Sequence, residues 1–208
     1  MKFDIFYLTR KHKRNKTNIQ SNKKDMCQKI HDLNRKTAKD LLIATGQYGI
    51  FPVDIAQICF KLGIRLREFD FTNIEAEKVS DEVAQKGNIL GAVVARGNDL
   101  AILYDIKNTS NRRRFTIAHE IAHICLDMDP HESFHIEYRR DSISNDSKEQ
   151  KANIFAGELL IPTNMLTSLI GDSKYISNDL VPPLCELFMV SENVLRARLK
   201  HLKITVLT

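Results

Sequence analysis

Two helices are predicted from the first apolar pattern along the chain. Residues 24–45 carry apolar side chains at helical spacing, which predicts one amphipathic helix that ends near Gly46. These apolar positions are Met26, Ile30, Leu33, Leu41 and Leu42. Residues 51–64 predict a second helix, with Pro52 at its start and Gly63 past its end. Its core-facing positions are Val53, Ile55, Ile58 and Leu62.

Strand patterns follow these helices. Residues 64–69 predict one strand, and residues 88–105 hold two apolar runs that include β-branched side chains. The polar tetrapeptide at residues 96–99 separates the two runs, which predicts an antiparallel hairpin. Because further helical patterns come after the hairpin, we predict an α+β fold with a small antiparallel sheet rather than a doubly wound parallel sheet.

A pair of histidines marks the helix that is predicted after the hairpin. The stretch RRRFTIAHEIAHICLDMD, residues 112–129, places His119 and His123 on one helical face, with Glu120 directly after the first. The opposite side carries Ile117, Ile121 and Ile124. Such a helix can dock its apolar side in a core and hold both imidazoles towards a cleft. Two histidines at this spacing beside a glutamate are typical of zinc peptidases, in which the glutamate is the general base.

The bare HExxH pattern occurs twice, so its context has to decide between the two matches. HESFH, residues 131–135, also fits, but its segment offers few apolar side chains to anchor a rigid site. We therefore predict that His131 and His135 lie in an exposed loop or short helix beside the active site. Cys125 falls about 200° around the first helix from His123, so it is predicted to be core rather than ligand.

A third ligand is needed, because catalytic zinc usually takes three protein ligands and keeps a fourth position for water. Ser147 and Gln150 predict a capping box, which starts a helix that Pro162 stops. Glu149 lies in the first turn of this helix. Asn153 follows one turn later on the same face, where it can steady a histidine. The alternative is that Glu149 serves only the helix dipole.

Two linked motifs in these helices resemble those of the ImmA/IrrE family of metallopeptidases. They are RRRFTIAHEIAHICL, residues 112–126, and EQKANIFAGELLIP, residues 149–162. Weaker similarity extends over most of residues 50–202. The resemblance implies a zincin-like metallopeptidase domain in which Glu120 is the catalytic acid/base. The zinc ligands that it implies are His119, His123 and Glu149.

The resemblance also implies a function and a partner. A bound zinc ion lowers the pKa of water to about 7 and polarises a peptide carbonyl, and Glu120 would carry the proton to the leaving amine. Histidine and carboxylate ligands suit Zn2+ best, with Mn2+ and Fe2+ as alternatives. The implied role is a regulatory protease that cleaves a helix-turn-helix transcriptional repressor. The alternative is a non-proteolytic regulator that binds DNA or protein and whose metal site is structural or vestigial.

Positive charge is concentrated near the N-terminus. Residues 1–40 hold 12 Lys or Arg against 4 Asp, whereas the other residues hold 19 against 22 acidic ones. Residues 9–24 have almost no apolar side chains, and we predict a basic, disordered tail at residues 1–23. Residues 24–175 are predicted to form the metallopeptidase domain, and residues 176–208 a C-terminal helical subdomain packed on it.

The length of the apolar runs and the spacing of the cysteines also indicate the cellular compartment of the protein. No apolar run approaches the ~20 residues of a membrane span, and the basic start reverses the charge order of a signal peptide. We therefore expect a cytoplasmic protein that has no membrane partner. The cysteines have no CxxC spacing, which predicts reduced and mostly buried thiols. They are Cys27, Cys59, Cys125 and Cys185.

Residues 179–202 predict two helices joined at FMVS, a shape that resembles a helix-turn-helix. Ser191 is the predicted N-cap of the second helix. Its buried stripe is Leu195, Leu199 and Leu202. The basic residues that can touch phosphates are Arg196, Arg198, Lys200 and Lys203. Because the acidic Glu192 leads this helix, we favour a helical pair that completes the peptidase fold or grips substrate over direct DNA binding.

Overall fold

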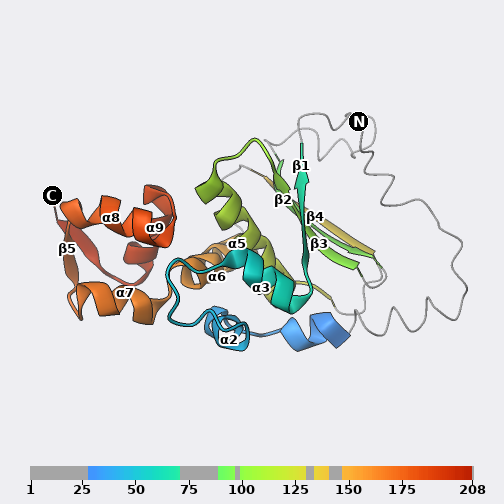
Figure 1. Ribbon diagram of the computed structural model, residues 1–208, viewed down its shortest axis with the longest axis horizontal. Helices are drawn as coiled ribbons and strands as arrows, with labels where there is room; N and C mark the ends of the chain where they lie inside the picture. Colours follow the sequence, from blue (N-terminus) through green and yellow to red (C-terminus); the bar gives the residue numbers. More distant parts are fainter. Residues whose placement is uncertain (1–27, 71–88, 97–98, 130–133, 141–146, 208) are drawn as a thin grey trace, which may run out of the picture.

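The computed structural model describes residues 28–70, 89–96, 99–129, 134–140 and 147–207, and the predicted basic tail lies outside them. A sheet with helices packed on it forms one part, and the C-terminal helices gather at the opposite end (Figure 1). The helices are a segment at residues 28–33, α2 (Ala38–Ala44), α3 (Ile55–Leu62), α5 (Ser110–Leu126), α6 (Ser147–Leu160), α7 (Thr163–Ile170), the 3-10 helix η4 (Asn178–Leu180), α8 (Val181–Phe188) and α9 (Glu192–His201). The strands are β1 (Arg65–Phe69), β2 (Ile89–Arg96), β3 (Asp99–Asp105), β4 (Phe134–Arg140), β5 (Tyr175–Ser177) and β6 (Thr205–Leu207). This arrangement confirms the predicted α+β class.

The main sheet has the strand order β1-β3-β2-β4. β2 and β3 pair antiparallel, which confirms the predicted hairpin. β1 pairs with β3 in parallel, so the sheet is mixed and not wholly antiparallel as predicted. Parallel neighbours need a long connection, and the chain between β1 and β3, which includes β2, is long enough to provide it.

The described end of the second HExxH string lies in a strand and not in the predicted loop or short helix. Its last two residues, Phe134 and His135, begin β4, which pairs antiparallel with β2 at the edge of the sheet. His131 lies outside the described residues. The reason is visible in the sequence FHIEYRR, because its apolar and polar residues alternate with the period of a strand.

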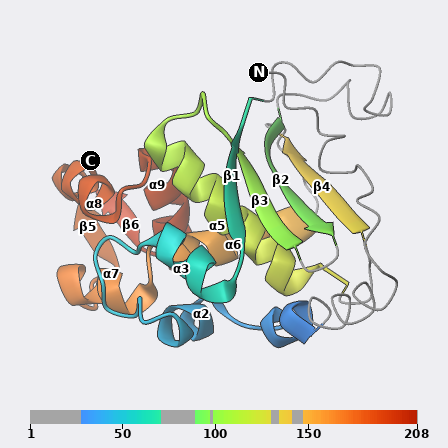
Figure 2. The same ribbon diagram turned by 45° about the vertical axis from the view of Figure 1, so that its right-hand side comes forward.

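α5 is the central helix of the fold. It packs against β2 and β3 on one side and against α6 on another (Figure 2). Every residue from Thr116 to Cys125 is buried, so His119 and His123 are buried as well as the isoleucines. The sequence predicted a helix whose histidine side faces a cleft. α6 packs on that side, where the side chain of Glu149 stays 30% exposed.

The first predicted helix is broken into two. Residues 28–33 are helical, and α2 starts after a turn in which Arg35 has a φ of 64°. The N–H of Arg35 donates to the carbonyl of Cys125 at 2.9 Å, which ties this turn to the end of α5. Thr37 and Asp40 then form a capping box that begins α2. The break depends on a contact with a distant helix, so the spacing of apolar residues does not reveal it.

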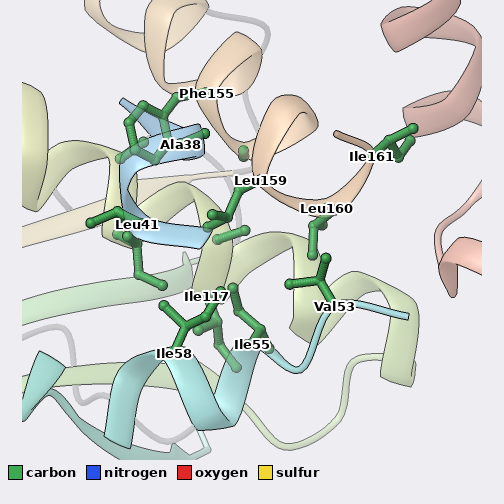
Figure 3. Packing of buried hydrophobic residues seen from close by; sticks show 14 of the residues in the cluster. Ala38, Leu41, Val53, Ile55, Ile58, Ile117, Phe155, Leu159, Leu160 and Ile161 are labelled. Carbon is green, nitrogen blue, oxygen red and sulfur yellow. The ribbon is translucent and has the colours of Figure 1, made fainter. Parts of the chain in front are cut away.

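One buried apolar cluster runs through both parts of the fold. α2, α5 and α6 meet in it at Leu41, Ile117 and Leu159 (Figure 3). Phe188 of α8 and Leu199 of α9 belong to the same cluster. The predicted C-terminal helix pair is therefore present, but α7 and the small parallel pair β5–β6 were not predicted. Within the described ranges, none of the helices has the length and apolar character that a membrane span requires.

α5 lies close to the sheet at Gly91 of β2. A Cβ atom added at Gly91 would lie 2.5 Å from Cγ2 of Thr116, 3.0 Å from Oε1 of Glu120 and 3.2 Å from the carbonyl oxygen of Leu103. A register shift in the pairing of β2 with β4 falls between Ile89 and Gly91. A residue without a side chain is therefore required where the helix meets this irregular strand.

We predict that Gly91→Ala lowers the free energy of unfolding by about 1–3 kcal/mol, because the added methyl group overpacks the contact between α5 and β2. Gly157→Ala is the matched control, since a Cβ there lies 3.5 Å from Cδ of Arg198, an ordinary contact inside α6. This second change should raise the free energy of unfolding by about 0.5–1 kcal/mol. Urea unfolding followed by circular dichroism measures both. A Gly91→Ala protein as stable as the parent would contradict the close approach.

Candidate metal centre

α5 is anchored before it reaches the histidines. Thr109 caps its N-terminus by accepting a hydrogen bond from the N–H of Arg112. The guanidinium of Arg114 donates to the carbonyl of Val53 at 2.9 Å and to the carbonyl of Met189 at 3.2 Å. Arg114 therefore connects α5 to the segment before α3 and to the turn after α8. These contacts orient the helix that carries the histidine pair.

α6 brings a carboxylate to the same place. Glu149 lies in the first turn of α6, as predicted. The helix begins at Ser147 itself, so Ser147 is not the capping residue before the helix that the sequence suggested. Small and fully buried side chains on α5 and α6 permit the close approach of these helices. They are Ala118, Ala122, Ala152 and Ala156.

Three side chains from these helices converge. The Nε2 atoms of His119 and His123 are 2.9 Å apart. Oε2 of Glu149 lies 3.2 Å from Nε2 of His119, and Oε1 lies 3.2 Å from Nε2 of His123. His119 is 0% exposed and His123 is 3% exposed, whereas the side chain of Glu149 is 30% exposed. The group is therefore buried on the side of α5, and solvent reaches it on the side of Glu149.

The other ring nitrogen of each histidine faces an oxygen acceptor. Nδ1 of His119 lies 3.0 Å from Oδ1 of Asn153, as the sequence predicted for a residue one turn after Glu149. Nδ1 of His123 lies 2.8 Å from Oδ2 of Asp127. Each Nδ1 can donate its hydrogen to the oxygen, which leaves the lone pair of Nε2 directed towards Glu149.

These donors fit a metal ion. Ligand atoms bonded at about 2.0–2.2 Å in a tetrahedral zinc site lie about 3.3–3.6 Å apart, slightly more than the separations of the three side chains. His119, His123 and Glu149 each offer one such atom within 4.8 Å of the others. Their lone pairs would repel one another unless a proton or a metal cation lies among them. Two imidazoles and one carboxylate are also the donor set of catalytic zinc.

The negative charge of Glu149 also supports a metal site. When the imidazoles are protonated at Nε2, hydrogen bonds from His119, and then from His123, hold the pKa of the Glu149 carboxyl well below its ordinary value. Glu149 is therefore a carboxylate at neutral pH. A carboxylate that only served the dipole of α6 would point into solvent near the N–H groups of its own helix. Glu149 instead contacts both histidines of another helix.

Glu120 lies next to this group in sequence but turns elsewhere. It is fully buried, and its Oε1 is near Gly91 of β2. The donor group consists of His119, His123 and Glu149 and does not include Glu120. Its carboxylate therefore lies outside the group of converging donor atoms.

The structure also places the predicted cysteines. Cys59 and Cys125 are buried, and burial raises the pKa of each thiol to about 12. Cys185 is half-buried and its thiol pKa is also raised by burial. All three are free thiols, as predicted, and Cys27 lies outside the described residues.

Arg198 of α9, one of the four basic residues that the sequence suggested for phosphate contact, does not face solvent. Arg198 is only 4% exposed, because it donates to the carbonyl of Ile161 and to Oγ1 of Thr163 and pairs with Glu158. Burial lowers its pKa to about 10, so the guanidinium stays charged at neutral pH. The sequence suggested that Arg198 touches phosphates, and its burial between α6, α7 and α9 corrects that prediction.

Comparison with known proteins agrees with this geometry. The family model Peptidase_M78, described as the IrrE N-terminal-like domain, matches residues 59–200. The chain belongs to this family. The match includes the histidine pair on α5 and Glu149 on α6, and it confirms the resemblance that the two motifs indicated. Since this is a family of metallopeptidases, the protein is a metal-dependent peptidase with a zincin-like domain. No match was found among curated proteins.

We predict that His119→Ala loses bound metal, whereas His131→Ala keeps it. The reason is that His119 belongs to the converging donor group, while β4 places His135 in a strand rather than on a helix with His131. Metal per chain, measured by mass spectrometry after dialysis against zinc, distinguishes the two variants. Circular dichroism controls for folding. Retention of metal by His119→Ala together with its loss from His131→Ala would place the site at the second string.

Proposed function

We propose that this protein is a zinc-dependent regulatory peptidase whose substrate is a helix-turn-helix transcriptional repressor. In this proposal His119, His123 and Glu149 bind the metal, and Glu120 is the catalytic acid/base. One observation carries the assignment: two buried imidazoles and a carboxylate from a second helix converge within 4.8 Å, beside a buried glutamate. Manganese or iron would suit the same ligands, so zinc is a part of the proposal that metal analysis tests.

A metal bound here supplies Lewis acidity, which polarises the scissile carbonyl and acidifies the attacking water. The protein supplies orientation and proton transfer. His119 and His123 are held from behind by Asn153 and Asp127, so their Nε2 atoms keep fixed directions. Glu120 takes the proton of the attacking water on a carboxylate oxygen and then gives it to the leaving amine. Its contact with β2 at Gly91 limits the directions in which the carboxylate can turn.

The repressor is the finer part of the proposal. It is supported by the similarity of the motifs to ImmA/IrrE peptidases, which implies regulatory cleavage of such a partner. The burial of Arg198 also disfavours the alternative in which α9 binds DNA directly. A repressor acts where the DNA is, so the proposal places the peptidase in the cytoplasm. We further propose residues 24–175 as the peptidase domain and residues 176–208 as a helical subdomain that is packed on it.

Glu120→Gln is expected to bind zinc as the parent does but to cleave about 100-fold to 10,000-fold more slowly, because an amide cannot accept the proton of water. Zinc content and the rate of substrate cleavage are measured on the same preparation. Asp172→Asn, the same chemical change on an exposed residue after α7, is the matched control and should cleave at the parental rate. Parental activity in Glu120→Gln would remove Glu120 from the mechanism.

The substrate class is tested with candidate helix-turn-helix repressors in the presence and absence of a chelator. Two repressor fragments that appear only without chelator are the expected result. An intact repressor that is bound equally well with and without metal would contradict cleavage and favour the non-proteolytic regulator. Hydrolysis of casein at a similar rate would contradict a dedicated repressor substrate and indicate a general peptidase.

A further inference from the structure

The residue at the C-terminus of α5 is chemically unusual for its position. Asp127 is the C-cap, with φ −121° and ψ −22°, and its N–H donates to the carbonyl of His123 at 2.9 Å. Helices usually end on glycine or asparagine in the left-handed conformation, which Asp127 does not adopt. A carboxylate at this end is also opposed by the negative end of the helix dipole, typically by about 0.3–1 kcal/mol. Helix capping therefore does not explain an aspartate here.

The side chain of Asp127 makes a contact that does explain it. Oδ2 lies 2.8 Å from Nδ1 of His123, and the carboxylate is only 14% exposed. Asp127 caps α5 four residues after His123, so both partners of this contact belong to one helix and its cap. Asn153, the corresponding acceptor for His119, comes from the different helix α6.

We propose that Asp127 is a positioning residue that fixes the tautomer and the ring orientation of His123. This inference rests on the proposed metal centre. The carboxylate accepts the hydrogen of Nδ1, so the proton stays on that nitrogen and the lone pair of Nε2 faces the metal position. The negative charge of the Asp127 carboxylate also strengthens His123 as a metal ligand. The neutral amide of Asn153 strengthens His119 less. The two histidines are thus unequal ligands, and His123 is the stronger one.

The test measures zinc affinity by competition with a chromophoric chelator. Asp127→Ala should bind zinc about 10-fold to 100-fold more weakly than the parent. Asp127→Asn keeps an oxygen acceptor without the charge and should recover part of the loss. Asp129→Ala removes the same charge from an exposed position two residues later and should bind as the parent does. Circular dichroism of the zinc-free proteins controls for folding.

A spectroscopic readout separates positioning from general destabilisation. In protein labelled with 15N-histidine and loaded with zinc, long-range 1H–15N spectra should show His123 protonated at Nδ1. The Nδ1 signal of His123 should shift in Asp127→Ala, while that of His119 should stay unchanged because Asn153 still holds it.

The outcomes also distinguish this inference from the function on which it rests. Parental affinity in Asp127→Ala, with binding abolished in His119→Ala, would overturn the role of Asp127 and leave the metal centre intact. An equal loss in Asp129→Ala would mean that net charge acts rather than the hydrogen bond, which also overturns it. A parent protein that does not bind zinc, or whose binding survives His119→Ala, would overturn both.

Discussion

The packing of α5 against α6 forces two imidazole nitrogens and a carboxylate into one small space. Electron-rich groups at such separations repel one another, and burial makes the repulsion stronger because the local dielectric is low. The arrangement persists because the apolar cluster on both helices, which includes Ile121 and Phe155, is buried by the same contact. The packing of α5 and α6 thus brings these three donors together.

The parts of this site that lie within one helix could be predicted from sequence. The i, i+4 spacing of His119 and His123 defines a shared face, and the position of Glu149 in the first turn of a predicted helix makes it a candidate ligand. Asn153 follows from the same helical geometry. The hairpin of β2 and β3 was equally accessible, because a polar turn separates two β-branched runs. In each of these cases the structure follows from the spacing of residues within one short segment of the sequence.

The remaining features depend on contacts between distant segments. Arg35 breaks the first helix because its N–H reaches Cys125, and Arg198 is buried because acceptors on α6 and α7 surround it. The contact of Asp127 with His123 was not predicted, although the two residues are four apart in the sequence. A carboxylate at the end of a helix is usually expected to face solvent. The prediction for the second HExxH string was wrong for another reason. Its spacing suits a helix, but the alternation after Phe134 favours a strand, and pairing with β2 decides the outcome.

The ion pair of Arg198 with Glu158 links the last long helix to the helix that carries a metal donor. Leu199 and Ile204 belong to the same apolar cluster as the buried side chains of α6. The docking of α9 therefore helps to hold α6, and with it Glu149, in place.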